Sequence, residues 1–145
     1  MKYLLAFALL GSVWVADFMF TNCPGPCPRM SAQMRKVQQG TPAGVKLVSF
    51  SVDPQRDTPD VLVKYAARYQ ADPARWHFLT GDASKLDALA FSAFHLNRVD
   101  GSLQHSTRFA LVDRQARIRA YYLSDEQDAV SRVIADAKRL ERSGE

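Results

Sequence analysis

The sequence predicts an α/β fold in which a mixed central sheet carries helices on both faces. Apolar runs of strand length alternate with segments of helical periodicity along the chain. Two neighbouring apolar runs, at residues 107–112 and 117–123, are separated by a short polar turn and have the pattern of a hairpin. Strand–helix repeats place strands in parallel, whereas a hairpin adds antiparallel strands, so the combination indicates a mixed sheet.

The first strand and the first helix are the clearest elements of the N-terminal half. Residues 13–20 form an apolar run that only Asp17 interrupts, which is typical of a buried strand. A helical segment follows at residues 29–39, and Gly40 supplies its stop signal.

The second strand and the second helix are joined by a polar turn. Residues 45–52 alternate Val, Leu and Phe with Lys and Ser, as expected of a strand. After the turn at residues 53–57, Thr58 is placed to cap a helix that has Pro59 at its first position and continues to about residue 69.

The remaining elements complete the pattern. Residues 76–80 predict a short strand, and residues 82–94 predict a helix with one apolar face. After the hairpin, a last helix is expected over about residues 126–142, with acids in its first turn and bases in its last. The order of elements, β-α-β-α-β-α-β-β-α, gives a thioredoxin-like arrangement.

The chain is long enough for one such domain, which we assign to residues 13–145. Residues 1–12 read as a truncated or signal-like N-terminal segment. The uncharged stretch at residues 3–16 is too short to span a bilayer, which needs about 20 residues. Its apolar residues also continue directly into the first strand, so removing the stretch as a signal would sacrifice that strand.

Composition narrows the range of functions. A chain that is 47% hydrophobic and 23% charged is typical of a globular protein. The net charge of +4 is small, and no basic stripe is interleaved with aromatic residues, so we expect no nucleic-acid partner. Two cysteines are too few for a disulfide framework, which favours a reactive or metal-binding role for them.

Cys23 and Cys27 lie between the first strand and the first helix, in a loop with three prolines. Two thiols this close can form a disulfide, exchange one with a partner, or bind a soft metal. The prolines restrict the loop, which favours a fixed separation of the two sulfurs. We also expect the N-terminal end of the following helix to lower the thiol pKa values.

The three residues between the cysteines distinguish the pair from two-residue zinc and dithiol motifs, and no second cysteine pair completes a zinc site. Two thiolates with one imidazole suit copper, because thiolates select Cu(I) and imidazole accommodates Cu(II). Of the three histidines, His77 is expected to be a sheet residue and His95 a helix-end residue. His105 directly precedes a strand, where it could meet the cysteine loop at the same edge of the sheet.

Three blocks of the sequence, at residues 20–28, 51–59 and 105–113, resemble the Sco/SenC copper proteins in order and spacing. The resemblance implies a thioredoxin-like fold in which Cys23, Cys27 and His105 bind copper as Cu(I), Cu(II) or both. For the block at residues 51–59 we expect a structural role, as a turn and helix cap.

The resemblance also implies a cellular role. Such a protein delivers copper to the dinuclear copper site of cytochrome c oxidase, or reduces the cysteines of that site. Its partners would be the copper-receiving oxidase subunit and an upstream copper donor or thiol reductant. Its location would be the periplasm or the outer face of the inner membrane.

Two other readings stay open at this point. One is a thiol–disulfide oxidoreductase or a peroxide-reducing relative, with Cys23 as the attacking thiolate and Cys27 as the resolving one. The other is a structural disulfide in a binding domain. His105 separates copper binding from dithiol exchange, because only copper binding should need it. Whether the chain is an enzyme is therefore open; we favour a metallochaperone over a thiol–disulfide reductase.

Overall fold

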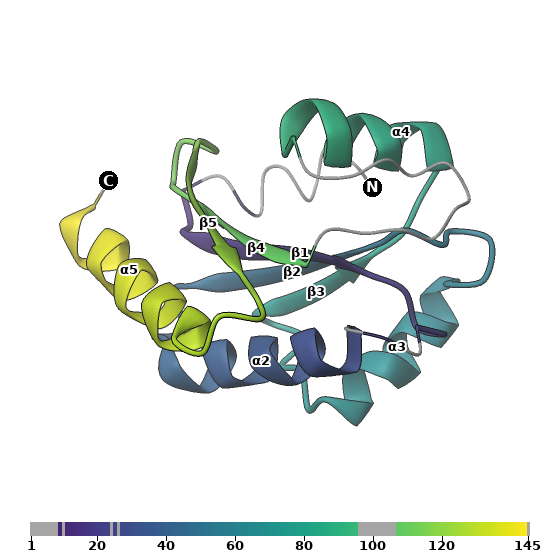
Figure 1. Ribbon diagram of the computed structural model, residues 1–145, viewed down its shortest axis with the longest axis horizontal. Coiled ribbons are helices and arrows are strands. Elements are labelled where there is room, and N and C mark those ends of the chain that lie inside the picture. The colour runs from purple at the N-terminus through teal and green to yellow at the C-terminus, as the bar shows by residue number, and fades with distance from the viewer. Residues whose placement is uncertain (1–8, 10, 24, 26, 96–106, 145) are drawn as a thin grey trace.

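The computed structural model describes residues 9, 11–23, 25, 27–95 and 107–144. Its centre is a five-stranded sheet in the order β3-β2-β1-β4-β5, as Figure 1 shows. The strands are β1 (Trp14–Met19), β2 (Lys46–Ser51), β3 (Trp76–Leu79), β4 (Arg108–Val112) and β5 (Ile118–Leu123). Strands β1, β2 and β3 are parallel, whereas β4 runs antiparallel to β1 and β5 antiparallel to β4. The predicted mixed sheet is therefore confirmed.

Helices cover both faces of this sheet, as predicted. Helices α2 (Cys27–Gly40), α3 (Pro59–Arg68) and α5 (Ala129–Ser143) lie on one side. On the other side α4 (Ala83–Asp87) continues as a π-helical segment, η1 (Ala88–Ala93). The sequence predicted a single helix over residues 82–94, and the change of helix type was not foreseen. No helix in the described part of the chain has the length and apolar character needed to cross a membrane.

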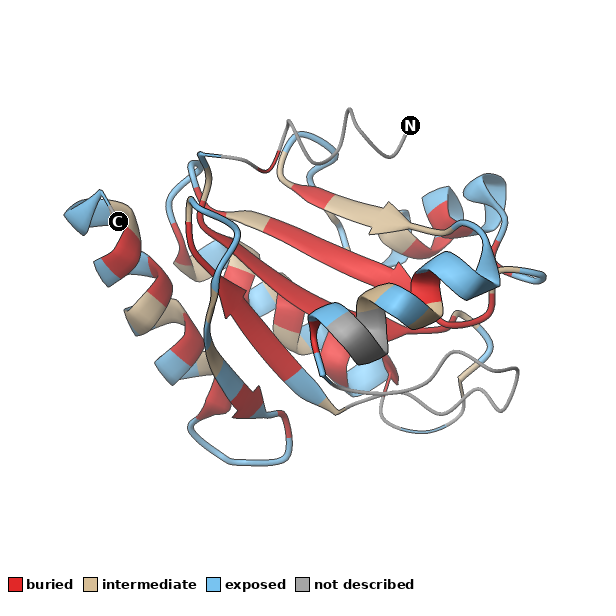
Figure 2. Cartoon of the chain, turned by 90° about the horizontal axis from the view of Figure 1, so that it is seen from above, coloured by how far each residue is buried: buried red, intermediate tan, exposed pale blue. Residues whose placement is uncertain are grey.

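Strand β1 is buried along its whole length and separates two hydrophobic cores (Figure 2). Successive side chains of a strand point to opposite faces of the sheet. Val13 and Val15 accordingly pack with residues of α2 and α5, whereas Ala16 and Phe18 pack with Phe94, which directly follows η1. The ring of Phe94 stands edge-on to that of Phe18, with centroids 5.6 Å apart.

A local sequence signal sets the start of α3, whereas the last helix starts later than predicted. The Thr58 hydroxyl accepts a hydrogen bond from the Val61 N–H, which confirms the predicted cap of α3. The last helix begins at Ala129 rather than near residue 126. Two hydrogen-bonded turns precede it, from Glu126 N–H to the Leu123 carbonyl and from Ala129 N–H to the Glu126 carbonyl. The acidic residues therefore lie before this helix and not in its first turn.

Candidate functional site

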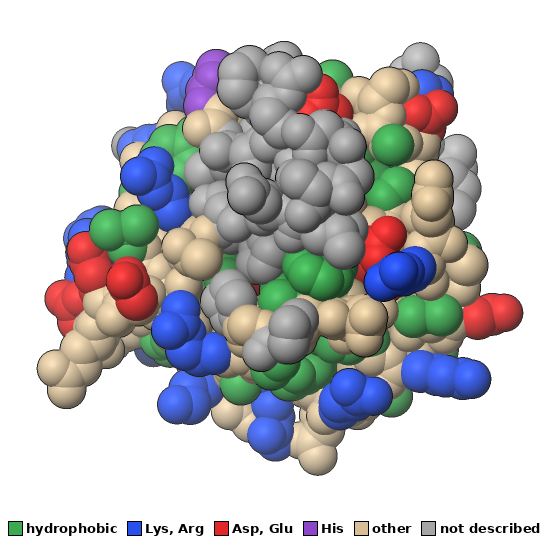
Figure 3. Space-filling view, turned by 45° about the vertical axis from the view of Figure 1, so that its right-hand side comes forward, with side chains coloured by type: hydrophobic (Ala, Val, Ile, Leu, Met, Phe, Trp, Pro, Cys, Tyr) green, Lys and Arg blue, Asp and Glu red, His purple; other side chains and the backbone are tan. Residues whose placement is uncertain are grey.

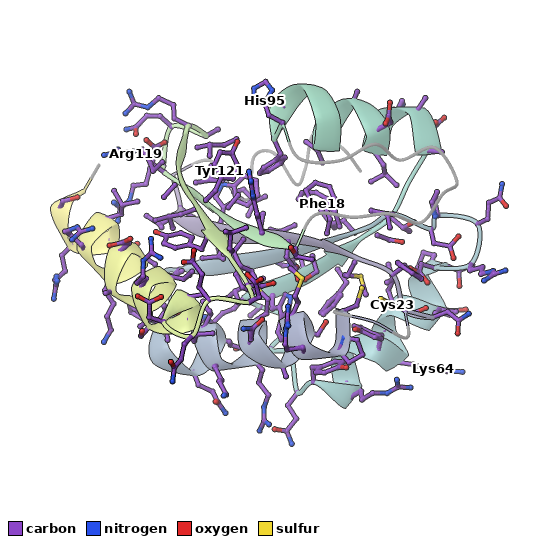
Figure 4. All side chains as sticks on the ribbon, viewed as in Figure 1. Phe18, Cys23, Lys64, His95, Arg119 and Tyr121 are labelled. Atoms are coloured by element: carbon purple, nitrogen blue, oxygen red, sulfur yellow. The ribbon has the colours of Figure 1, made fainter. Side chains whose placement is uncertain are left out.

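The two cysteines lie where β1 leaves the sheet and α2 begins. In Figure 4 the Cys23 side chain lies beside the connection between these elements. Cys27 is the first residue of α2 and is fully buried, while Cys23 is partly exposed. No disulfide joins them. The fold thus presents one sulfur toward the surface and keeps the other beneath it.

Burial determines the acidity of Cys27. It raises the pKa of this thiol well above its usual value, and a hydrogen bond with Cys23 raises it further. The expected lowering of thiol pKa by the helix end is therefore wrong for Cys27. Removing water from around the thiolate costs more than the Phe20 backbone hydrogen bond restores. In the absence of metal, Cys27 is a neutral thiol.

The chain before Cys23 is held by a buried carboxylate from another part of the sequence. Asp57, which is fully buried, accepts hydrogen bonds from the Thr21 hydroxyl at 2.5 Å and from the Thr21 N–H at 3.2 Å. Its second oxygen also accepts a hydrogen bond from the Ser51 hydroxyl at 2.7 Å. The block at residues 51–59 is therefore structural, as predicted, but its action reaches the cysteine loop.

Little in the sequence indicated this contact, since 36 residues separate Thr21 from Asp57. Thr21, Ser51 and Asp57 occur in two of the blocks that carry the family resemblance. Their occurrence together in those blocks was the available signal for the contact. Within the turn, Arg56 pairs with Asp53 at 3.9 Å. The Asp57 carboxylate instead faces Thr21 and Ser51.

A second carboxyl group, that of Asp17, lies buried in the middle of β1. It accepts a hydrogen bond from Ser49 on β2, and the Ser49 hydroxyl accepts one from the indole N–H of Trp76 on β3. The other oxygen of Asp17, Oδ2, has no hydrogen-bond partner among the described residues. Burial raises the pKa of Asp17 to about 7, and its charge contributes to the raised pKa of Cys27. The sequence marked Asp17 only as an interruption of an apolar strand.

The histidines occupy three different situations. His77 lies in β3 and is partly buried, as predicted, and burial, with Lys46 nearby, lowers its pKa. His95 is exposed just beyond η1. His105 lies outside the described residues.

The register of β4 bears on the position of the chain near His105. Ala16 of β1 lies opposite Ala110 of β4, and Trp14 lies opposite Val112. Because the two strands run in opposite directions, β4 begins at the edge of the sheet where β1 ends. Arg108, the first residue of β4, is therefore at the same edge as the cysteine loop.

The described residues contain no cluster of three or more His, Cys, Asp or Glu side chains that could hold a metal. They supply two sulfur donors, Cys23 and Cys27, in a setting that suits a soft metal. Binding a metal would require a third ligand from elsewhere in the chain. Thiol–disulfide exchange would require only the two thiols.

Comparison with known proteins identifies the group to which this arrangement belongs. The profile of the SCO1/SenC family matches residues 6–141. A SCO1/SenC family lipoprotein from Bacillus anthracis is 34% identical and superposes with a TM-score of 0.85, over 94% of this chain and 85% of that one.

Two further solved structures are similar. BsSco, described as a member of the Sco family of cytochrome c oxidase assembly proteins and as having a disulfide switch, is 35% identical with a TM-score of 0.79. That match covers 92% of this chain and 82% of BsSco. ScoI of Bradyrhizobium japonicum, solved with copper bound, is 25% identical with a TM-score of 0.73, over 92% of this chain and 88% of ScoI. The thioredoxin-like fold is thereby confirmed, and the chain belongs to the SCO1/SenC family.

Proposed function

We propose that this protein binds copper through Cys23, Cys27 and His105 and acts as an assembly factor for cytochrome c oxidase. The observation that carries the proposal is the pair of thiols at the start of α2, one buried and one partly exposed, in a chain of the SCO1/SenC family. The copper found in ScoI of Bradyrhizobium japonicum supports the choice of metal. Copper is here the cargo that the protein receives and hands on.

The unequal burial of the two sulfurs suits a transfer function. Cys27, at the base of the site, must lose its proton to bind copper, because the thiolate is the metal ligand. Cys23 is accessible to a partner's ligands and can be exchanged first. Soft thiolates favour Cu(I), and an imidazole from His105 would allow Cu(II) as well.

The partner is proposed to be the copper-receiving subunit of the oxidase, in keeping with the assembly role described for BsSco. Lys and Arg side chains gather along the lower margin of the face that carries the cysteine loop, over α2 and α3 (Figure 3). Helix α2 carries Arg35 and Lys36, and helix α3 carries Lys64 and Arg68. An acidic docking surface on the partner would complement this margin, and association would then weaken with salt. An upstream copper donor or thiol reductant would meet the same face.

For the location we propose the periplasm or the outer face of the inner membrane. The similar protein of Bacillus anthracis is described as a lipoprotein, which supports a location at a membrane surface.

The second candidate is thiol–disulfide exchange, which the same burial difference favours. In such a reaction the thiolate of Cys23 attacks the disulfide of a partner and forms a mixed disulfide, releasing one partner thiol. Cys27 then loses its proton and attacks Cys23, which releases the second partner thiol and leaves a Cys23–Cys27 disulfide. The disulfide switch described for BsSco supports this chemistry in the family.

Anaerobic copper titration of the reduced protein tests the proposal. Wild-type protein is compared with Cys23→Ser, Cys27→Ser and His105→Ala, and with His95→Ala as a control that removes an exposed histidine. We expect one tight site that is lost in both serine variants, weakened more than about tenfold in His105→Ala, and unchanged in His95→Ala. Binding that does not depend on His105, together with turnover of a disulfide substrate, would instead establish the oxidoreductase.

A further inference from the structure

Asp57 connects the second sequence block to the cysteine loop through a compact set of hydrogen bonds. Its carboxylate is fully buried and accepts the Thr21 hydroxyl, the Thr21 N–H and the Ser51 hydroxyl. Hydrogen bonds from hydroxyl groups to a carboxylate are short and strong, and a partly buried N–H that loses its acceptor destabilises the fold. We call Asp57, Thr21 and Ser51 the loop clamp.

Asp57 and Ser51, two members of the loop clamp, are held by the end of β2 and by the turn that follows it. Ser51 is the last residue of β2 and lies opposite Met19, the last residue of β1. The Ser51 hydroxyl also accepts the Asp53 N–H at 3.0 Å, and the Asp57 N–H donates to the Asp53 carbonyl at 2.9 Å. The carboxylate is therefore positioned by the turn that joins β2 to α3.

The two cysteines are consequently positioned by different parts of the structure. Cys27 is set by α2, in which it is the first residue and fully buried. Cys23 lies in the loop, two residues after Thr21, and Thr21 is held through both its backbone and its side chain. The position of the Cys23 sulfur relative to that of Cys27 then depends on the loop clamp.

We propose that Asp57 is a positioning residue that sets the separation and orientation of the two sulfurs without touching the metal. This inference rests on the proposed chemistry of Cys23 and Cys27, and it deepens that function. Residues that orient metal ligands typically change metal affinity by about 10- to 100-fold when they are removed. The same displacement changes the reduction potential of the cysteine pair, because the disulfide needs a narrow range of geometry.

The test compares two pairs of variants with a matched control. Asp57→Ala removes all three acceptor contacts, whereas Asp57→Asn keeps an oxygen for the Thr21 N–H and an amide that can donate to the Thr21 hydroxyl. Thr21→Val removes one hydrogen bond, whereas Thr21→Ser keeps it. Asp60→Ala removes an exposed acid from the first turn of α3 and serves as the control.

Each variant is measured in two ways, at temperatures where circular dichroism shows it folded. One measurement is Cu(I) affinity by anaerobic competition. The other is the equilibrium between the Cys23–Cys27 disulfide and its dithiol in a glutathione buffer. In that equilibrium two glutathione thiols are oxidised to one disulfide while the protein disulfide gains two electrons and two protons.

We expect Asp57→Ala and Thr21→Val to lower Cu(I) affinity by about tenfold or more and to shift the glutathione equilibrium. Asp57→Asn and Thr21→Ser should recover most of both values, and Asp60→Ala should leave both unchanged. If Asp57→Ala does not fold, the Thr21 pair decides the matter, since it alters a single hydrogen bond.

Wild-type affinity and an unchanged glutathione equilibrium in folded Asp57→Ala or Thr21→Val, with only thermal stability reduced, would overturn the inference. Failure of the proposed function looks different, because then the wild-type protein itself would not bind copper at Cys23. In that case the glutathione equilibrium would still report on the loop clamp.

Discussion

Asp17 and Cys27 lie on or beside β1, and burial raises the pKa of both side chains. For both groups, the removal of water from the charged form is the largest cause of the raised pKa. Protonation is therefore the means by which each avoids a buried charge. The copper binding that we propose at Cys27 would reverse this for one of the two groups, since the bound form is the thiolate.

The raised pKa of Asp17 predicts that the reduced protein loses stability as the pH rises. The carboxyl group has an ordinary pKa of 3.8 and a folded pKa of about 7. The stabilisation that this pKa difference contributes is thus fully present below pH 3.8 and is lost as the pH rises through 7. From this group alone we expect the free energy of unfolding to be about 2–3 kcal/mol lower at pH 8 than at pH 5.

Urea unfolding at the two pH values measures this loss, with Asp17→Asn as the matched variant. The asparagine keeps an oxygen for the Ser49 hydroxyl but cannot ionise. Its free energy of unfolding should change less between pH 5 and pH 8 than that of the wild type, by the same 2–3 kcal/mol. Equal pH dependence in the two proteins would show that Asp17 stays in one protonation state throughout.

At the scale of elements, local sequence signals predicted the strands and helices well. Thr58 and Pro59 marked the start of α3, and the hairpin of β4 and β5 followed from two apolar runs around a polar turn. Local signals could not reveal the loop clamp, because it joins Thr21 to Asp57 across two elements. They also misjudged Cys27, since its acidity is set by tertiary burial.

The turn between β4 and β5 depends on a buried acid. The carboxylate of Asp113 accepts the N–H groups of Gln115 and Arg117 and contacts the guanidinium groups of Arg117 and Arg119 at 3.1 and 3.2 Å. Asp113→Ala would leave those two N–H groups without their acceptor. We expect a loss of about 2–4 kcal/mol in the free energy of unfolding.

Chemical denaturation checks this value, with Asp125→Ala as a control that removes an exposed acid from the loop after β5. The control should stay within about 0.5 kcal/mol of wild type. A similarly small effect of Asp113→Ala would mean that water replaces the carboxylate in the turn.

At the scale of the whole molecule, the sheet order brings distant parts of the chain to one edge. β1 and β4 are neighbours and antiparallel, so the end of β1 and the start of β4 lie together. The cysteine loop follows the former, and His105 precedes the latter by a few residues in sequence. From the sequence, His105 was expected to meet the cysteine loop because it directly precedes a predicted strand. His105 lies outside the described residues, and its role as a ligand stays a prediction.

The most direct test of the account is X-ray absorption spectroscopy of the reduced protein loaded with one copper ion. We predict a first shell with two sulfur donors and one imidazole nitrogen. The imidazole contribution should disappear in His105→Ala, while both sulfur donors remain. A wild-type spectrum with no sulfur donors, or with two sulfurs and no imidazole, would contradict the proposed copper site.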